Sequence, residues 1–470
     1  MKNTIKHHYH IRLRAVAVAL LACFCLLTTS CDDNKTTPAP TKNIVALAQG
    51  NTQLTTLVAA LNRFPDLVAT LSGSGTFTVF APSNQAFTNL LTAIGQTSLD
   101  NVPDAVLKKI LQYHVISTAA LQSTQLVAGT RNTVANENIT ITVTGGLKLN
   151  TNVNVSTPNV QASNGVVHVV DAVLVNPSIA PIVGTIVAPA YFNKDFTTLI
   201  AAVNAASPDI LTTLLSSSKK TLFAPTNAAF TAAGITTLPA QAELDKILKY
   251  HVLNSEVKAA GLPTNTAPVN SEITTLQGKF YLSNRGTTGV FINGRTKVTQ
   301  TDIIGSNGVV HVIDRTLSPP SQTIAQIATA LSTATAPQFT KLLQALSRTE
   351  AAAILTTASN ASANITLFAP TDAAFEASGI NLTTVSGTTL VAVLQKHIIS
   401  SPTTATGRVF SRDLVTGDVA TLNGNIAINA TNLTVASGGV TANILATTPT
   451  LINVLGTNGV IHAIDKVLLP

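Results

Sequence analysis

Cysteine and tryptophan are the first absences in this sequence. It has no tryptophan, and its three cysteines all lie within the first 31 residues. Beyond that point no cysteine pair can form a disulfide bond, so stability must come from the packed core. Charged residues are also scarce, at 10% of the chain, whereas hydrophobic residues make up 45%. This composition argues against disorder and favours packed strands with weakly charged surfaces.

Runs of like charge are absent as well. The formal net charge is +7, but four basic residues lie in an N-terminal segment that we expect to be removed: Lys2, Lys6, Arg12 and Arg14. Without them, 24 basic residues face 21 acidic residues. No Lys/Arg-rich run occurs, and aromatic residues do not alternate with basic ones as single-strand binders require. We therefore do not expect nucleic acid as a partner.

The N-terminus has the pattern of an export signal. A basic, His-rich start leads into an apolar run of 13 residues from Ala15 to Leu27, which is short of the roughly 20 that a transmembrane helix needs. The letters LLTTSC then end at Cys31 and resemble a bacterial lipoprotein signal, in which the peptidase cuts before a cysteine that carries the lipid. Thr28 departs from the Leu that is usual at the third position before the cysteine. An ordinary signal peptide with an incidental cysteine is the alternative.

We expect a signal peptide over residues 1–30, lipid attachment at Cys31 and a flexible tether over residues 31–42. The tether is polar and rich in Thr and Pro, as its letters DDNKTTPAPTK show. These features predict an exported chain that is lipid-anchored at the outer membrane or the cell surface. They leave the choice between a periplasmic and an external orientation open.

Three motifs recur three times in the same order. The opening motif is TVFAPSNQAF at 78–87, TLFAPTNAAF at 221–230 and TLFAPTDAAF at 366–375. The middle motif is ILQYHVI, ILKYHVL and VLQKHII, and the closing motif contains NGVVHVVD, NGVVHVID and NGVIHAID. The proline of the opening motif recurs after 143 and 145 residues, and periods this long indicate whole tandem domains. We place these domains at 43–177, 182–319 and 321–470, joined by short Pro-containing connectors.

Motifs in this order resemble the fasciclin domain over essentially the whole mature chain. The resemblance implies an α+β fold of three tandem fasciclin domains, each a β-sandwich wedge with packed helices. It also implies extracellular or surface-anchored modules associated with cell adhesion. In the family the Tyr-His pair of the middle motif has been linked to receptor binding, which makes Tyr113, His114, Tyr250 and His251 candidate binding residues. Lys396 replaces the tyrosine in the third unit, so any such role would be weaker there.

The residues of the opening and middle motifs predict architecture rather than chemistry. TVF alternates as a strand does, Pro82 stops strand pairing, and Ser83 is a residue type that caps helices. In the middle motif, apolar residues three, four and seven positions before His114 place the imidazole on the apolar stripe of a helix. We therefore predict buried, hydrogen-bonded histidines at His114 and at its two equivalents, His251 and His397.

The closing motif offers a His-Asp pair in each unit. His168 precedes Asp171 by three residues, and metal binding or acid–base chemistry is one reading of that pair. Side chains three apart on a strand point to opposite faces, so the pair cannot converge unless a bulge intervenes. We predict no metal site and no cofactor, and instead a central buried strand entered through an Asn-Gly turn whose glycine has positive φ. The equivalent pairs are His311 with Asp314 and His462 with Asp465.

If the motifs are scaffold, binding must lie in segments that differ between units. The candidates are the Thr- and Asn-rich segments 150–161, 284–300 and 429–443, which could equally be solvated β-surface. We predict a surface-anchored adhesion lipoprotein, not an enzyme, that binds an unidentified matrix protein or polysaccharide. The alternatives are a secreted metal-assisted hydrolase that uses the His/Asp motifs and a passive structural spacer.

Overall fold

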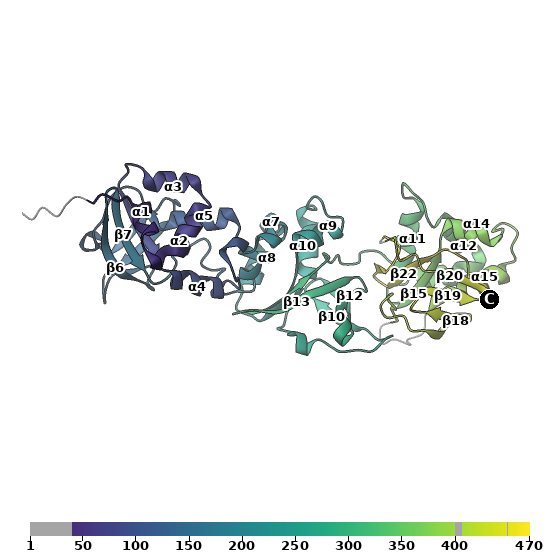
Figure 1. Ribbon diagram of the computed structural model, residues 1–470. Coiled ribbons are helices and arrows are strands. Elements are labelled where there is room, and N and C mark those ends of the chain that lie inside the picture. Colours follow the sequence, from purple (N-terminus) through teal and green to yellow (C-terminus); the bar gives the residue numbers. More distant parts are fainter. Residues whose placement is uncertain (1–39, 400–406, 449) are drawn as a thin grey trace, which may run out of the picture.

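The computed structural model describes residues 40–399, 407–448 and 450–470, so Cys31 and the leader lie outside the described part. Three α+β units follow one another in a row, from the purple end of the chain to the yellow end (Figure 1). The predicted fold class is confirmed. Among the described residues no single helix is both long and apolar enough to cross a membrane. Within this described part, the helical segments Lys194–Ala205 and Pro208–Leu215 reach that length and hydropathy only when taken together, and the chain bends by 119° between them.

Each unit runs from helices into a buried strand and ends on a second buried strand. The first unit contains α1 (Ile44–Gln49), α2 (Thr55–Asn62), α3 (Pro65–Ser72), β1 (Phe77–Pro82), α4 (Asn84–Ala93), α5 (Asp104–Tyr113), β2 (Val115–Ile116), β3 (Gly129–Asn132), β4 (Asn138–Thr142), β5 (Lys148–Leu149), β6 (Val153–Ala162) and β7 (Gly165–Val170). The second contains α6 (Ala188–Tyr191), α7 (Thr197–Ala205), α8 (Pro208–Leu215), β8 (Lys220–Pro225), α9 (Asn227–Ala232), α10 (Gln241–Tyr250), β9 (Val252–Leu253), β10 (Ser271–Thr275), β11 (Gly278–Asn284), β12 (Val290–Ile292), β13 (Thr296–Gly305) and β14 (Gly308–Ile313). The third contains α11 (Ile324–Ser332), α12 (Thr340–Leu346), α13 (Ala352–Ser359), β15 (Ile365–Pro370), α14 (Asp372–Ser378), α15 (Gly387–Lys396), β16 (Ile398–Ile399), β17 (Gly417–Thr421), β18 (Gly424–Asn429), β19 (Thr434–Ser437), β20 (Val440–Asn443), β21 (Val454–Gly456) and β22 (Gly459–Ile464).

The opening and closing motifs pair as parallel strands inside each sheet. β1 pairs with β7, β8 with β14 and β15 with β22, so that Phe80 lies opposite His168 in the first unit. Every residue of these six strands is buried, which confirms the predicted central strand. The strand-to-helix corner is also present. β1 ends at Pro82, and the side chain of Ser83 accepts a hydrogen bond from the backbone N–H of Ala86 at the start of α4.

The third unit departs from the other two at one strand. In the first two units a single ten-residue strand, β6 or β13, joins both halves of a seven-stranded sheet. In the third unit the corresponding stretch is divided into β20 and β21. The result is two four-stranded sheets, and the described residues 444–448 and 450–453 lie between the two strands.

The predicted Asn-Gly turn is present, and the glycine of the closing motif is required for a second reason that we did not predict. The φ is positive at Gly165 (159°) and at Gly308 (147°), and these glycines follow the turns that join β6 to β7 and β13 to β14. A Cβ at Gly165 would lie 2.2 Å from the carbonyl oxygen of Phe77 in the parallel neighbour, so glycine is needed because the two strands approach closely. Added Cβ atoms at Gly308 and Gly459 would lie 2.0 Å and 2.3 Å from the equivalent carbonyl oxygens.

The asparagine before that glycine fastens helices to the sheet, a role that we did not predict. Asn164 Oδ1 accepts from the N–H of Ile44 at the start of α1, at 3.0 Å, and Nδ2 donates to the carbonyls of Leu71 and Gly73 at the C-terminal end of α3, at 2.8 Å each. Asn307 and Asn458 make the same three bonds in their own units. All three asparagines are buried, and Asn458 is completely so.

The first two units share one continuous hydrophobic core. Ile179 of the connector is buried in it, as are Ile182 and Ile186 at the start of the second unit and core residues of both units. The side chain of Gln96 in the first unit donates to the carbonyl of Pro189 in the second, at 3.1 Å. The connector therefore acts as part of the core, which holds the two units against each other.

Replacing Asn458 by alanine tests the fastening role. The change leaves the buried N–H of Ile324, the buried carbonyl of Ala358 and the partly buried carbonyl of Asn360 without this partner, so we expect the third unit to lose about 2 to 4 kcal/mol of unfolding free energy. Hydrogen–deuterium exchange on the full chain measures this loss as faster exchange of the backbone amides of β15 and β22. Asn432→Ala is the matched control, because Asn432 is exposed in the same unit. Equal protection of these amides from exchange in Asn458→Ala and Asn432→Ala would contradict the fastening role of Asn458.

Candidate functional site

The middle-motif histidines cap the ends of helices α5, α10 and α15 from inside the core. His114 is 2% exposed; its Nδ1 lies 2.8 Å from the carbonyl oxygen of Ile110, and its Nε2 accepts from the backbone N–H of Leu174 at 2.9 Å. A carbonyl can only accept and an N–H can only donate, so the ring is neutral with its proton on Nδ1. His251 and His397 make the same two bonds. The predicted buried histidines are confirmed.

The closing-motif histidines use the opposite tautomer. His168 Nε2 donates to the carbonyl of Leu121 at 2.9 Å, and Nδ1 accepts from the N–H of Asn159 at 3.3 Å. Its ring stacks on Phe80 at a centroid distance of 5.7 Å. His311 and His462 repeat this arrangement. In each of the six imidazoles both ring nitrogens are therefore occupied by backbone groups, so none is free to act as a base or a ligand.

Threonine at the first position of each opening motif works with these histidines, and we missed its role. The hydroxyl of Thr78 donates to the carbonyl of Ala119 at 2.7 Å and accepts from the N–H of Leu121 at 2.9 Å. His168 holds the carbonyl of the same Leu121. Thr221 and Thr366 are equally buried and bond the equivalent segments. The recurrence of threonine in all three motifs was the available signal.

The aspartates of the closing motif point away from the histidines, as predicted. The carboxylate of Asp171 accepts from the backbone and the side-chain amide of Asn154, at 2.8 and 2.7 Å. Asp314 and Asp465 bind the matching positions on the neighbouring strand. Within the described ranges no group of three or more His, Cys, Asp or Glu residues has the spacing of a metal site.

The candidate binding residues of the middle motif lie in the core. Tyr113 and Tyr250 are completely buried, and their hydroxyls donate to the carbonyls of Asn138 and Lys279, each at 2.8 Å. Lys396, their counterpart in the third unit, is also buried and donates to the carbonyl of Asn423 at 2.7 Å. A ligand cannot touch the Tyr-His pairs in this structure. Their binding role stays a prediction, and it would act through the strands that they hold.

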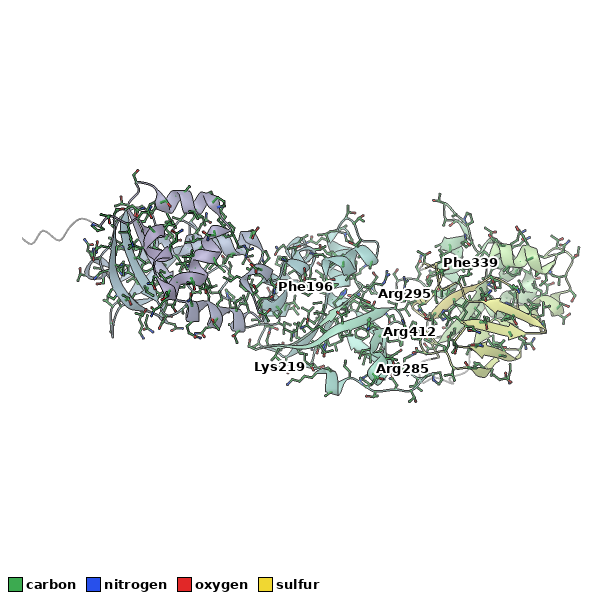
Figure 2. All side chains as sticks on the ribbon, in the orientation of Figure 1. Phe196, Lys219, Arg285, Arg295, Phe339 and Arg412 are labelled. Atoms are coloured by element: carbon green, nitrogen blue, oxygen red, sulfur yellow. The ribbon has the colours of Figure 1, made fainter. Side chains whose placement is uncertain are left out.

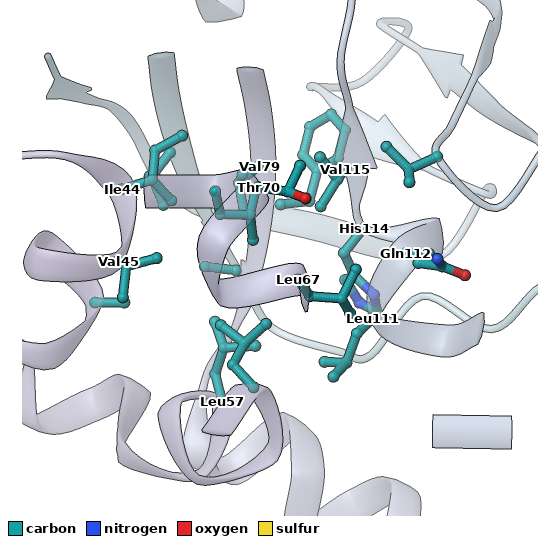
Figure 3. A pocket seen from close by; sticks show the side chains of 17 residues that line it. Ile44, Val45, Leu57, Leu67, Thr70, Val79, Leu111, Gln112, His114 and Val115 are labelled. Carbon is teal, nitrogen blue, oxygen red and sulfur yellow. The ribbon is translucent and has the colours of Figure 1, made fainter. Parts of the chain in front are cut away.

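A small cavity beside His114 does not provide a ligand site. Its volume is about 40 Å³, and its walls are formed mainly by apolar side chains such as Leu67, Leu111 and Val115 (Figure 3). A space of this size holds one or two water molecules at most, and it offers them few polar partners. The cavity is therefore a gap in the packing of the first unit.

Two of the three variable segments do come together. Segment 284–300 of the second unit and segment 429–443 of the third line one cleft of about 650 Å³. Phe291 and Arg295 come from the first of these segments, and Thr431 and Leu433 come from the second. The remaining segment, 150–161, contributes to β6 in the first unit. The structure thus identifies the junction of the second and third units as the candidate binding surface.

A buried carboxylate holds the two sides of this junction together. Asp413 of the third unit is completely buried and accepts from the side chains of Asn270, Ser283 and Arg285 of the second, at 2.8, 2.6 and 2.6 Å. Burial raises the pKa of Asp413, although its hydrogen bonds and Arg285 oppose that change. Arg408, from the same loop, lies over the ring of Tyr281 at 4.5 Å.

The loop that divides the sheet of the third unit also reaches the junction. Asn453 adopts a left-handed backbone conformation, with φ of 53°. Its side chain donates to the carbonyl of Gly294 in the second unit at 3.2 Å and to Ser411 at 2.8 Å. Together with Ala446 and Ile452, Asn453 therefore supplies part of the cleft wall.

The fasciclin domain model matches residues 52–176, 194–319 and 337–470, and the chain therefore belongs to the fasciclin-domain family. Among its relatives, protein sll1483 of Synechocystis sp. is 40% identical over 134 residues, which are 28% of this chain and 73% of that protein. The transforming growth factor-beta-induced protein ig-h3 of Oryctolagus cuniculus is 30% identical over 293 residues, 60% of this chain and 40% of that protein. Human periostin is 29% identical over 344 residues, 70% of this chain and 37% of that protein.

Both animal relatives are thus much longer than the region that they share with this chain. Among solved structures, the fasciclin domain pair of the insect cell adhesion molecule Fasciclin I covers 59% of this chain and 97% of its own, at 19% identity and a TM-score of 0.27. The family that the repeated motifs indicated is confirmed.

The neutral histidines predict a pH dependence of stability. Burial lowers the pKa to about 4 from the ordinary 6.5 in four of them: His114, His251, His397 and His462. Between pH 6.5 and about 4 the unfolded chain binds protons that the folded chain refuses, so the free energy of unfolding falls as pH decreases through this window. Each ring contributes on the order of 3 kcal/mol. Unfolding by denaturant at a series of pH values measures this loss.

Ring NMR signals supply the direct control for that prediction. We expect the six imidazoles of the folded mature chain to remain neutral down to the onset of acid unfolding. Folded rings that titrate close to 6.5 would contradict the buried, backbone-bonded assignment.

Proposed function

We propose that this chain is a surface-anchored adhesion lipoprotein that binds a matrix protein or polysaccharide through its modules. Fasciclin domains occur in cell-adhesion and extracellular-matrix proteins. The observation that carries the proposal is that the repeated polar side chains are used inside the units, while two variable segments meet at an open junction. Binding at that junction needs no catalytic group.

Anchoring through Cys31 suits a chain whose described part has no single membrane-spanning helix. Several acyl chains on one cysteine bury enough CH₂ groups for durable attachment. The polar tether over residues 31–42 would then separate the first unit from the lipid surface.

The row of units favours combined binding. The shared core of the first two units and the buried carboxylate between the second and third limit rotation at both joints. Neighbouring units can then bind one long ligand at the same time through weak contacts. Once the first unit is bound, the next contact forms within the same complex, so the overall affinity exceeds that of any single unit.

The metal-assisted hydrolase is not favoured by the geometry, because each histidine is bonded to the backbone through both ring nitrogens and each aspartate is bonded to the neighbouring strand. The passive spacer predicts no ligand on any matrix-protein or glycan array. Binding of the full chain to such an array therefore separates the spacer from the adhesion role.

Replacing Cys31 by serine tests the anchor and its consequence. We expect the variant to lose metabolic labelling with a fatty acid and to move from the membrane fraction to the medium or the periplasm, because the lipid is its only proposed attachment. Cells that make it should adhere to the matrix no better than cells lacking the gene. Cys25→Ser, within the removed leader, is the control. Retention of the Cys31 variant in the membrane would contradict lipid anchoring.

A further inference from the structure

Arginines gather around the cleft between the second and third units. Arg295 and Arg315 line it from the second unit and Arg412 from the third. Figure 2 shows Arg295 and Arg412 close to Arg285, where the two units meet. The described residues that line this cleft include no Asp or Glu. The concave surface is therefore positively charged, although the mature chain as a whole is close to neutral.

Most of this charge is not neutralised by the protein. Arg285 is the exception, because its guanidinium forms an ion pair with Asp413 at 2.6 Å. Within the described part of the chain, Arg295, Arg315 and Arg412 form no ion pair. The guanidinium of Arg412 lies over the ring of Phe291, with its central carbon 4.3 Å from the ring centroid, and a guanidinium stacked on its face keeps its in-plane N–H donors available. Three guanidinium groups thus face one cleft without a counter-charge.

Like charges held together in this way favour an anion. Arg295 is half-buried; burial lowers the pKa of its guanidinium, and the positive charge of Arg315 acts in the same direction. An anion between these side chains would relieve both effects. Guanidinium groups bind carboxylate and sulfate through paired N–H donors, a geometry that an ammonium group lacks.

The remaining lining and the extent of the surface indicate a polymer with hydroxyl groups. Thr288, Ser411 and Thr431 place hydroxyl-bearing side chains along the cleft. A second cleft of about 470 Å³ shares Arg295, Arg315 and Asn453 with the first, so the charged surface continues beyond it. A single small anion would leave most of this surface unoccupied.

We propose that the cleft between the second and third units binds the carboxylate or sulfate groups of an anionic polysaccharide. Arg295, Arg315 and Arg412 pair with the acidic groups, and the neighbouring hydroxyl and amide side chains bond the sugar hydroxyls. This inference rests on the proposed adhesive function and adds to it the class and the position of the ligand.

The test uses the full mature chain with polygalacturonate and dextran sulfate as probes. Neutral dextran and polyglutamate serve as comparisons, and affinity is measured at low and at physiological salt. We expect the double variant Arg295→Gln/Arg412→Gln to bind both acidic glycans about tenfold more weakly or worse, because two charged hydrogen-bonding groups are lost. Arg295→Lys/Arg412→Lys keeps the charge without the paired donors, so it should bind with intermediate affinity.

The matched control is Lys42→Gln/Lys466→Gln, which removes the same charge from two exposed positions outside the cleft. Thr431→Glu provides a variant that keeps every arginine: Thr431 is exposed on the cleft wall, and the added carboxylate should abolish binding. Thermal melting confirms that each variant is folded before its affinity is compared.

Three results would overturn the inference. The first is that the native chain binds neither acidic glycan. The second is that Lys42→Gln/Lys466→Gln weakens binding as much as Arg295→Gln/Arg412→Gln does. The third is that the native chain binds polyglutamate more tightly than it binds the acidic glycans. Cell adhesion is scored separately. Glycan binding without adhesion would reject the adhesive function and leave the site, whereas adhesion unchanged in the double arginine variant would reject the site as its ligand contact.

Discussion

The parallel pairing of the opening and closing strands is the constraint on which each unit depends. It joins segments that stand at opposite ends of a unit, such as Phe77 and Gly165, and it buries both strands completely. A buried strand pair leaves no water for the polar groups around it, so each must find a partner inside the protein. Thr78, Asn164 and His168 supply those partners, and this explains why they recur in every unit.

The same constraint separates architecture from function in this chain. Histidine is a frequent catalytic and metal-binding residue, yet here six histidines serve as fixed connectors between backbone groups. Their burial makes the neutral ring the stable form. Binding is left to surfaces that the strand pair does not determine, and these are the loops and the outer strands.

The two joints of the chain are built on different physics. The first is a continuous apolar core, whereas the second combines the buried carboxylate of Asp413 with a small apolar cluster of Tyr281, Phe410 and Val460. The departure from the repeat adds Ala446, Ile452 and Asn453 to the wall of the cleft at this second joint. Polar joints of this kind position side chains well, because hydrogen bonds to a buried carboxylate are directional.

The number of units, the strand-to-helix corner, the buried closing strand and the buried histidines all followed from the sequence. Periodicity and residue type act over a few positions, and these features depend on little else. The fastening role of Asn164 and the close approach at Gly165 did not follow, because both depend on atoms about 90 to 120 residues away in the chain. The basic cleft was equally hidden: Arg295 and Arg412 are distant in sequence, and only the packing of one unit on the next places them together. Local pattern therefore determined the units, and tertiary contacts alone decided where a ligand can meet them.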